Sequence, residues 1–204
     1  MKILNLYAGV GGNRKLWEGH QITAVEGNPQ IAELYREFYP DDEVVIGDAH
    51  AYLLSHFEKF DFIWSSPPCQ RNTKMMKATR HKIRKYPDLR LYEEVIFLDN
   101  FYQGAWVVEN VVPYYEPLIP AKKVGRHLFW SNAEIQARDV ERPAGFINRT
   151  TVEGKRALMD WLGIHYDKNI YYEGNHDPAQ ILRNCVHPLV GLDVLLTATK
   201  SLPR

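Results

Sequence analysis

The first half of the chain alternates short apolar segments with amphipathic ones, and this alternation limits the possible folds more than any other feature. The apolar segments have strand length and are rich in β-branched and aromatic residues. Strands are expected at Ile3–Tyr7, Ile22–Val25, Val44–Ile46, Phe60–Trp64 and Trp106–Val108. Helices are expected between them, at Arg14–Glu18, Pro29–Phe38, His50–Phe57 and Leu91–Tyr102. Strand–helix alternation predicts an α/β fold with a doubly wound, mostly parallel sheet that is covered on both faces.

The second half of the chain differs in composition, with frequent proline, glycine and polar residues after about residue 113. Helices are expected at Gly154–Leu162 and after Pro188. A chain of 204 residues suggests one domain over 1–204, with residues 131–178 as a small variable or recognition excursion. No signal peptide and no membrane span are expected, because the apolar runs are short. Two cysteines, Cys69 and Cys185, argue against a disulfide framework or a zinc cluster and fit a reducing cytosol.

The charges are unevenly distributed, although the net charge is zero. Residues 71–90 carry eight basic side chains against one acid, Asp88. Such a stripe is typical of a nucleic-acid contact, and a solvated lysine-rich loop is the alternative. The residues expected to contact nucleic acid are Gln70, Arg71, Lys74, Lys77, Arg80, Lys82, Arg84 and Lys85.

The ends of the first three expected strands carry groups that suit a nucleoside. Tyr7-Ala8-Gly9-Val10-Gly11-Gly12 lets a ligand approach the backbone, although a plain tight turn explains it equally well. A helix is expected to follow and to point its N–H groups at that ligand. Glu26 follows Gly9 by seventeen residues and could accept both hydroxyls of a ribose. Asp48 could accept an adenine amino group.

Cys69 follows the fourth expected strand, after two prolines that fix its position. The neighbouring basic stripe predicts an electropositive, partly open setting that lowers the pKa of the thiol. Cys185 has no such setting and is interpreted as structural. Glu109 and Asn110 follow the fifth strand; apolar neighbours predict a raised pKa for Glu109, and Asn110 can position its neighbours.

Seven short segments follow one another along the chain in this order: YAGVGG, AVEGN, GDA, PPCQ, ENV, GRHLFW and NCVHP. Together they resemble the motifs of the DNA (cytosine-5) methyltransferases, from residue 4 to about residue 196. PCQ with ENV downstream is specific, and GRHLFWSN and ILRNCVHP are similar to short phage or prophage members. The resemblance implies the Rossmann-like fold of S-adenosylmethionine-dependent methyltransferases, a location in the bacterial or phage-infected cytoplasm, and a place in DNA methylation or restriction-modification.

The resemblance also implies residue roles. Cys69 would be the nucleophile, Glu109 would hold N3 and the amino edge of cytosine, and Arg126 would contact the base. S-adenosylmethionine would be bound by Tyr7, Ala8, Gly9, Val10, Gly12, Glu26, Asn28, Asp48, Ala49, Pro68, Asn184 and Val186. No metal is implied.

The chain departs from the family in three places. Lys122 and Val124 stand where the family has glutamine and its first arginine, and Asn72–Thr73 replaces the serine that often follows PCQ. About fifty residues separate Trp130 from Asn184, where the family usually has a large target-recognition domain. The recognition domain is therefore minimal or absent, and specificity is short, relaxed or supplied by a partner protein.

The expected activity is methyl transfer from S-adenosylmethionine to carbon 5 of cytosine in double-stranded DNA, after flipping of the base. Three alternatives stay open at this point. An RNA methyltransferase would use the same catalytic set, a catalytically silent relative would keep only the fold, and a cysteine enzyme would act on free nucleotides. The glycine loop and the basic stripe favour a polymer substrate over the third.

Overall fold

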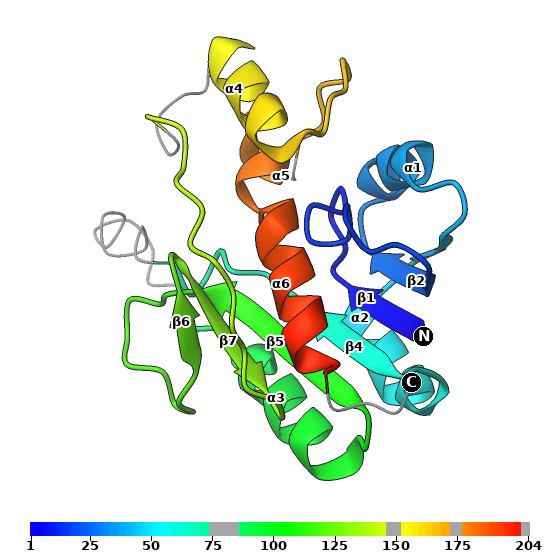
Figure 1. Cartoon of the computed structure of the whole chain (residues 1–204). Coiled ribbons are helices and arrows are strands. Elements are labelled where there is room, and N and C mark those ends of the chain that lie inside the picture. The colour runs from blue at the N-terminus through cyan, green and yellow to red at the C-terminus, as the bar shows by residue number, and fades with distance from the viewer. Residues whose placement is uncertain (74–85, 146–151, 172–176, 201–204) are drawn as a thin grey trace.

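A seven-stranded sheet forms the centre of the computed structural model, which describes residues 1–73, 86–145, 152–171 and 177–200 (Figure 1). The strand order is β3-β2-β1-β4-β5-β7-β6. The strands are β1 (Lys2–Leu6), β2 (Gln21–Glu26), β3 (Glu43–Ile46), β4 (Phe62–Ser65), β5 (Ala105–Val111), β6 (Lys122–Val124) and β7 (His127–Ser131). Neighbours among β1 to β5 pair in parallel, whereas β7 is antiparallel to β5 and β6. The predicted α/β class with a mostly parallel sheet is confirmed.

Alternation along the central strands divides the core between the two faces of the sheet. Ile3, Phe62 and Val107 belong to one apolar cluster, which contains residues of α6 (Pro188–Ala198). Their sequence neighbours, such as Leu4 and Ile63, belong to a second cluster with α2 (Ala49–His56) and α3 (Arg90–Phe101). Successive side chains of a strand point to opposite faces, so both faces must be apolar to be covered.

Local capping explains where three helices begin. Asn28 accepts hydrogen bonds from the backbone N–H of Gln30 and Ile31 at the start of α1 (Pro29–Phe38). Asp48 accepts one from Ala51 at the start of α2, and His187 accepts one from Leu189 at the start of α6. Side-chain oxygens or nitrogens at this position satisfy N–H groups that have no partner within the helix.

One predicted helix is wrong: within Arg14–Glu18, the residues up to Leu16 form turns and the last two have no regular structure. The segment between Gly12 and Gly19 is short, and its side chains are held by tertiary contacts instead. Arg14 pairs with Asp42 (Nε–Oδ2 2.6 Å), and Trp17 is buried in the core with its Nε1 donating to the Gly191 carbonyl at 3.2 Å. The glycine loop therefore has no helix N-terminus behind it.

Other boundaries differ less. The expected strands and helices are confirmed to within about two residues, except that β5 continues to Val111 because β7 pairs with its final residues. The β6–β7 hairpin, the short helix α5 (Gln180–Arg183) and the 3₁₀ helix Phe57–Lys59 were not expected.

Helices α4 (Val152–Leu162), α5 and α1 share an apolar cluster beside the main sheet. Within the described ranges, one segment, Gln180–Ala198, is long and apolar enough to cross a membrane by length and composition. However, 67% of that window is buried inside the protein, and its Val194 and Leu195 lie in the core. A core helix passes the same test, so the finding is weak support for a membrane span.

Candidate active site

A pocket opens where the strand order reverses, at the carboxyl ends of β1 and β4. Ligands of doubly wound sheets bind at this point because the loops there diverge to opposite faces. The pocket encloses about 860 Å³ of empty space, its open mouth included. It is lined by Tyr7, Ala8, Gly9, Gly12, Asn13, Glu26, Ser66, Pro67, Pro68, Cys69, Gln70, Glu109, Asn110, Val111, Arg126, His127, Ile181, Asn184, Cys185 and Val186.

The loop after β1 turns through three left-handed residues, Tyr7 (φ 55°), Gly9 (φ 57°) and Gly11 (φ 76°). A Cβ atom placed on Gly9 would meet nothing within 4 Å. Gly9 therefore presents bare backbone to open space in the pocket, as the expected close approach of a ligand requires.

Glu26 at the end of β2 is held at the pocket wall by backbone N–H groups. Gly9 donates to its Oε2 at 2.9 Å, and Asn28 donates to its Oε1 at 2.8 Å. Burial raises the pKa of this carboxyl, and the backbone N–H groups of Asn28, Gly9 and Gly27 oppose that shift. A carboxylate has about four acceptor sites, so Glu26 can accept from a ligand hydroxyl beside these backbone donors. The ribose of S-adenosylmethionine, whose hydroxyls donate, fits these acceptor oxygens and the bare backbone of Gly9.

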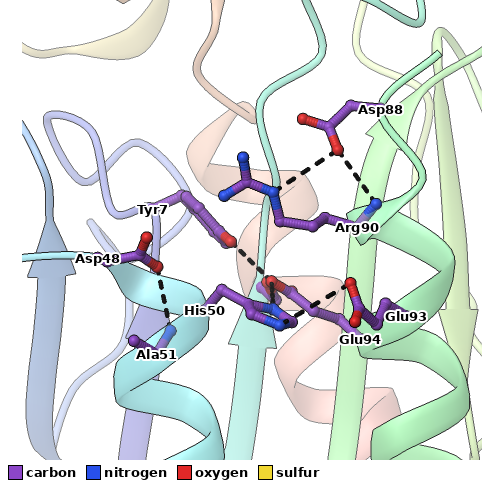
Figure 2. A network of polar contacts seen from close by, with 9 residues as sticks. Tyr7, Asp48, His50, Ala51, Asp88, Arg90, Glu93 and Glu94 are labelled. Carbon is purple, nitrogen blue, oxygen red and sulfur yellow. Dashed lines mark hydrogen bonds and ion pairs between the residues drawn. The ribbon is translucent and has the colours of Figure 1, made fainter.

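Tyr7 is fixed by a buried carboxylate on α3, as Figure 2 shows. Its hydroxyl donates to Oε1 of Glu94 at 2.6 Å, and Nδ1 of His50 lies 3.1 Å from the same oxygen. The hydroxyl of Ser65 donates to Oε2 at 2.5 Å. These contacts join the ends of β1 and β4 to α2 and α3.

Four predicted cofactor residues lie outside the pocket lining: Val10, Asn28, Asp48 and Ala49. Val10 and Ala49 are buried in apolar clusters. Asn28 and Asp48 are helix caps, and Asp48 accepts from Ala51 N–H at 3.0 Å (Figure 2). The other eight predicted cofactor residues, from Tyr7 to Val186, line the pocket.

Cys69 lies in the loop after β4 and lines the pocket beside Pro68. Its carbonyl accepts from the backbone N–H of Asn72 (2.9 Å) and Thr73 (3.0 Å), which closes a turn after the thiol. Asn110 Nδ2 donates to the Pro67 carbonyl at 2.8 Å and so fixes the loop from β5. The predicted positioning role of Asn110 has this contact as its physical basis.

The expected low pKa of the Cys69 thiol is wrong. Burial and the negative charge of Glu109 raise the pKa of the thiol to about 11, and Arg126 opposes them. The free protein therefore holds Cys69 as a thiol near neutral pH.

The expected high pKa of Glu109 is also wrong. Burial raises the pKa of this carboxyl, but His127, Ser66 and Arg126 outweigh burial and leave the pKa below its ordinary value. His127 Nδ1 lies 2.5 Å from Glu109 Oε1. The free protein therefore holds Glu109 as a carboxylate.

Arg126 lies in the turn between β6 and β7, after Gly125 (φ 55°). Its Nη2 donates to the carbonyls of Arg183 (2.6 Å) and Cys185 (3.2 Å). A Cβ atom on Gly12 would lie 2.7 Å from the Val186 carbonyl, so the C-terminal segment packs directly on the glycine loop. The motifs around Gly12, Arg126 and Val186 thus meet at one end of the pocket.

Most of the predicted nucleic-acid residues fall outside the described ranges: Lys74, Lys77, Arg80, Lys82, Arg84 and Lys85. Of the two described ones, Gln70 lines the pocket and Arg71 is exposed. Over the described ranges, no group of three or more His, Cys, Asp or Glu side chains is arranged to hold a metal ion.

Sequence reasoning missed several pocket residues, of which His127 and Ser66 touch Glu109. In the sequence, the only indication that His127 belongs to the site is its position directly after Arg126. Cys185 is buried, as expected for a structural cysteine, although it also lines the pocket.

Structural similarity agrees with this fold. A methyltransferase of Entamoeba histolytica, EhMeth, superposes with a TM-score of 0.57 at 10% identity, over 100% of this chain and 99% of that chain. DNMT2 of Spodoptera frugiperda is 25% identical over 54% of this chain and 35% of that chain, with a TM-score of 0.40. A putative DNA modification methyltransferase from an Escherichia coli prophage is 21% identical over 57% of this chain and 33% of that chain, with a TM-score of 0.39.

No curated protein sequence is significantly similar to the chain. The family model for C-5 cytosine-specific DNA methylases matches residues 1–111. The match covers more than half of the chain and includes the glycine loop, Glu26, Cys69 and Glu109. The chain therefore belongs to the C-5 cytosine-specific DNA methylase family.

Proposed function

We propose that this protein methylates carbon 5 of cytosine in double-stranded DNA, with Cys69 as the nucleophile and Glu109 as the group that binds N3. One observation carries the proposal: Cys69, Glu109 and Glu26 line the same pocket. A thiol and a carboxyl that face one pyrimidine, beside a site for a nucleoside cofactor, suffice for this chemistry.

Covalent addition solves the chemical problem, because carbon 5 of cytosine is a poor nucleophile. Attack of the Cys69 thiolate on carbon 6 breaks the conjugation of the ring and makes carbon 5 enamine-like. S-adenosylmethionine, when bound beside Glu26, supplies the methyl group for carbon 5. Water then takes the carbon 5 proton, the sulfur–carbon 6 bond breaks, and the departing thiolate takes back the proton from N3, which restores the ring and the thiol.

The free site already contains the proton that the reaction needs at N3. Cys69 holds a proton and Glu109 does not. Attack requires the reverse, a thiolate together with a proton between Glu109 and N3, and the total number of protons is unchanged. We assign the proton that leaves the sulfur to N3, where Glu109 stabilises the charge that develops on the ring.

A base within a duplex cannot reach this pocket without being flipped out of the helix. Residues 71–90 follow Cys69 and carry the basic stripe, so we infer that they grip phosphates around the flipped base. We assign residues 131–178 to a short recognition region within a single domain.

The test is transfer of a labelled methyl group to duplex DNA and, in parallel, to tRNA. The native protein should label cytosine in DNA and form a stable adduct with DNA that contains 5-fluorocytosine. Cys69→Ser should do neither. Labelling of tRNA alone would assign the chemistry to RNA, and absence of labelling on both would leave a silent relative.

A further inference from the structure

His127 and Glu109 form a contact that links two strands at the base of the pocket. Glu109 pairs with Phe129 across β5 and β7, so His127, two residues from Phe129, is its diagonal neighbour on the same face. His127 Nδ1 lies 2.5 Å from Glu109 Oε1. Glu109 is 5% exposed and His127 is 8% exposed, and both line the pocket.

The charged neighbours fix the protonation of this pair. Burial lowers the pKa of His127, and Arg126 and Arg142 lower it further, whereas Glu109 raises it; the net shift is downward. Glu109 is ionised for the reasons given above, with Cys69 as the remaining titratable group that faces it. A neutral imidazole beside a carboxylate must donate from the nitrogen in contact, so the hydrogen is on Nδ1.

We propose that His127 is a positioning residue for Glu109: it holds Oε1 and, together with the hydrogen bond from Ser66, fixes the rotation of the carboxyl group, so that its remaining acceptor capacity faces the cytosine edge. This inference rests on the proposed function. A carboxyl group held by two neighbours keeps one orientation, and catalysis requires such pre-orientation because misplacement of a group by a fraction of an ångström is costly.

The same contact determines the pH range of the reaction. Reaction requires free protein with an ionised Glu109 and a protonated Cys69, so activity is lost at low pH as Glu109 gains a proton. His127 lowers the pKa of Glu109. Loss of the Nδ1 donor must therefore raise the pKa of Glu109 and move the acid limb of kcat/KM to higher pH.

The experiment compares two amides at position 127. The side-chain amide of Asn can take the place of Nδ1, whereas that of Gln extends toward the place of Nε2. The two variants therefore carry the same functional group and differ only in where it lies. Transfer to duplex DNA is measured as kcat/KM from about pH 5 to pH 9. Melting temperature and S-adenosylmethionine affinity, by calorimetry, report whether each variant is folded.

His127→Asn should stay within about fivefold of the native rate, whereas His127→Gln should lose more than about tenfold, with an acid limb about one pH unit higher. Equal losses in both variants with unshifted limbs would indicate a merely structural residue and overturn the inference. If the native protein neither transfers methyl groups nor forms the 5-fluorocytosine adduct, the proposed function itself fails.

A second measurement uses only the native protein, so its result does not depend on whether a variant is active or folded. Nitrogen NMR of the histidine-labelled native protein reports which ring nitrogen carries the hydrogen. Hydrogen on Nδ1 of His127 at neutral pH is the expected result. Hydrogen on Nε2 alone would exclude donation to Glu109 and overturn the inference.

Discussion

The hydroxyl of Tyr7 donates a 2.6 Å hydrogen bond to Oε1 of Glu94, a carboxylate with no exposed surface (Figure 2). The bond joins the glycine loop after β1 to helix α3, which follows the basic stripe in the sequence. A buried carboxylate is costly unless its lone pairs are satisfied, and Ser65 and His50 supply the other partners. The wall of the proposed cofactor site is thus anchored to helix α3.

Tyr7→Phe should therefore destabilise the fold and weaken S-adenosylmethionine binding. The variant removes one donor from a buried charge, which costs about 1.5–3 kcal/mol of unfolding free energy. Urea unfolding and calorimetry measure the two effects. Tyr52→Phe is the matched control: among the described residues, the Tyr52 hydroxyl has no hydrogen-bond partner, and its ring stacks on His56. Equal stability of both variants would contradict the anchoring role.

The His50–Glu94 contact should make stability depend on pH. The hydrogen bond with Glu94 raises the pKa of His50 above its ordinary value, against the effect of burial. A histidine whose pKa is higher in the folded state contributes stability below its unfolded pKa, and loses that contribution as pH rises through the folded pKa.

The gap in unfolding free energy between the native protein and His50→Gln should therefore be larger at about pH 5.5 than at about pH 8.5. Urea unfolding at both pH values measures it. His56→Gln serves as control, because His56 contacts a backbone carbonyl, that of Tyr52, instead of a carboxylate. A gap that grows with pH would contradict the assignment.

Gly191→Ala tests how closely α6 approaches the loop before Trp17. A Cβ atom at position 191 would lie 2.2 Å from the Asn13 carbonyl oxygen and 2.7 Å from its Cα, which are backbone atoms that cannot move aside. Alanine in a helix normally gains up to about 1 kcal/mol over glycine. Here overpacking should dominate, with a net loss of about 1–3 kcal/mol in urea unfolding.

Gly47→Ala is the control, since a Cβ atom there would meet nothing within 4 Å. Its unfolding free energy should stay within about 0.5 kcal/mol of native. Stabilisation by Gly191→Ala would show that α6 is not held against the loop at this distance.

Local patterns were sufficient to predict much of this molecule. The strands β1 to β5 can be recognised in the sequence as apolar runs, because parallel strands are buried on both faces. Pro29 and Pro188 mark the starts of helices α1 and α6. The motif residues that line the pocket follow strands, and parallel strands bring their carboxyl ends together. These features depend only on short stretches of sequence.

Long-range register could not be predicted in this way. The contact of His127 with Glu109 depends on the antiparallel pairing of β5 with β7, which brings together residues eighteen apart. The predicted pKa directions of Cys69 and Glu109 were also wrong. Burial and the charge of Glu109 raise the pKa of Cys69, and His127, Ser66 and Arg126, all distant from Glu109 in the sequence, lower that of Glu109. The absent helix at Arg14–Glu18 reflects the tertiary contacts of Arg14 and Trp17, which override local propensity.

The reactivity of Cys69 should reveal its coupling to Glu109. The thiol has a pKa of about 11 because burial and the charge of Glu109 disfavour the thiolate. Alkylation by iodoacetamide should be slow at neutral pH and rise toward pH 11. Glu109→Gln removes the negative charge, so the pKa of the thiol should fall and alkylation at about pH 8 should become faster. Mass spectrometry of the Cys69 peptide measures the rate, and an unchanged or slower rate would contradict the coupling.

The basic stripe should determine how DNA binding responds to salt. Lys82, Arg84 and Lys85 contribute three of its eight positive charges. Each phosphate contact adds about 0.9 to the slope of log affinity against log salt concentration, so neutralising all three to Gln should reduce the slope by up to about 2.7. Fluorescence anisotropy with duplex DNA at several salt concentrations measures this slope. The control variant neutralises three exposed lysines elsewhere, Lys2, Lys59 and Lys200, and should keep the native slope. If both triple variants change the slope equally, the attraction comes from overall charge and the stripe has no special role in gripping DNA.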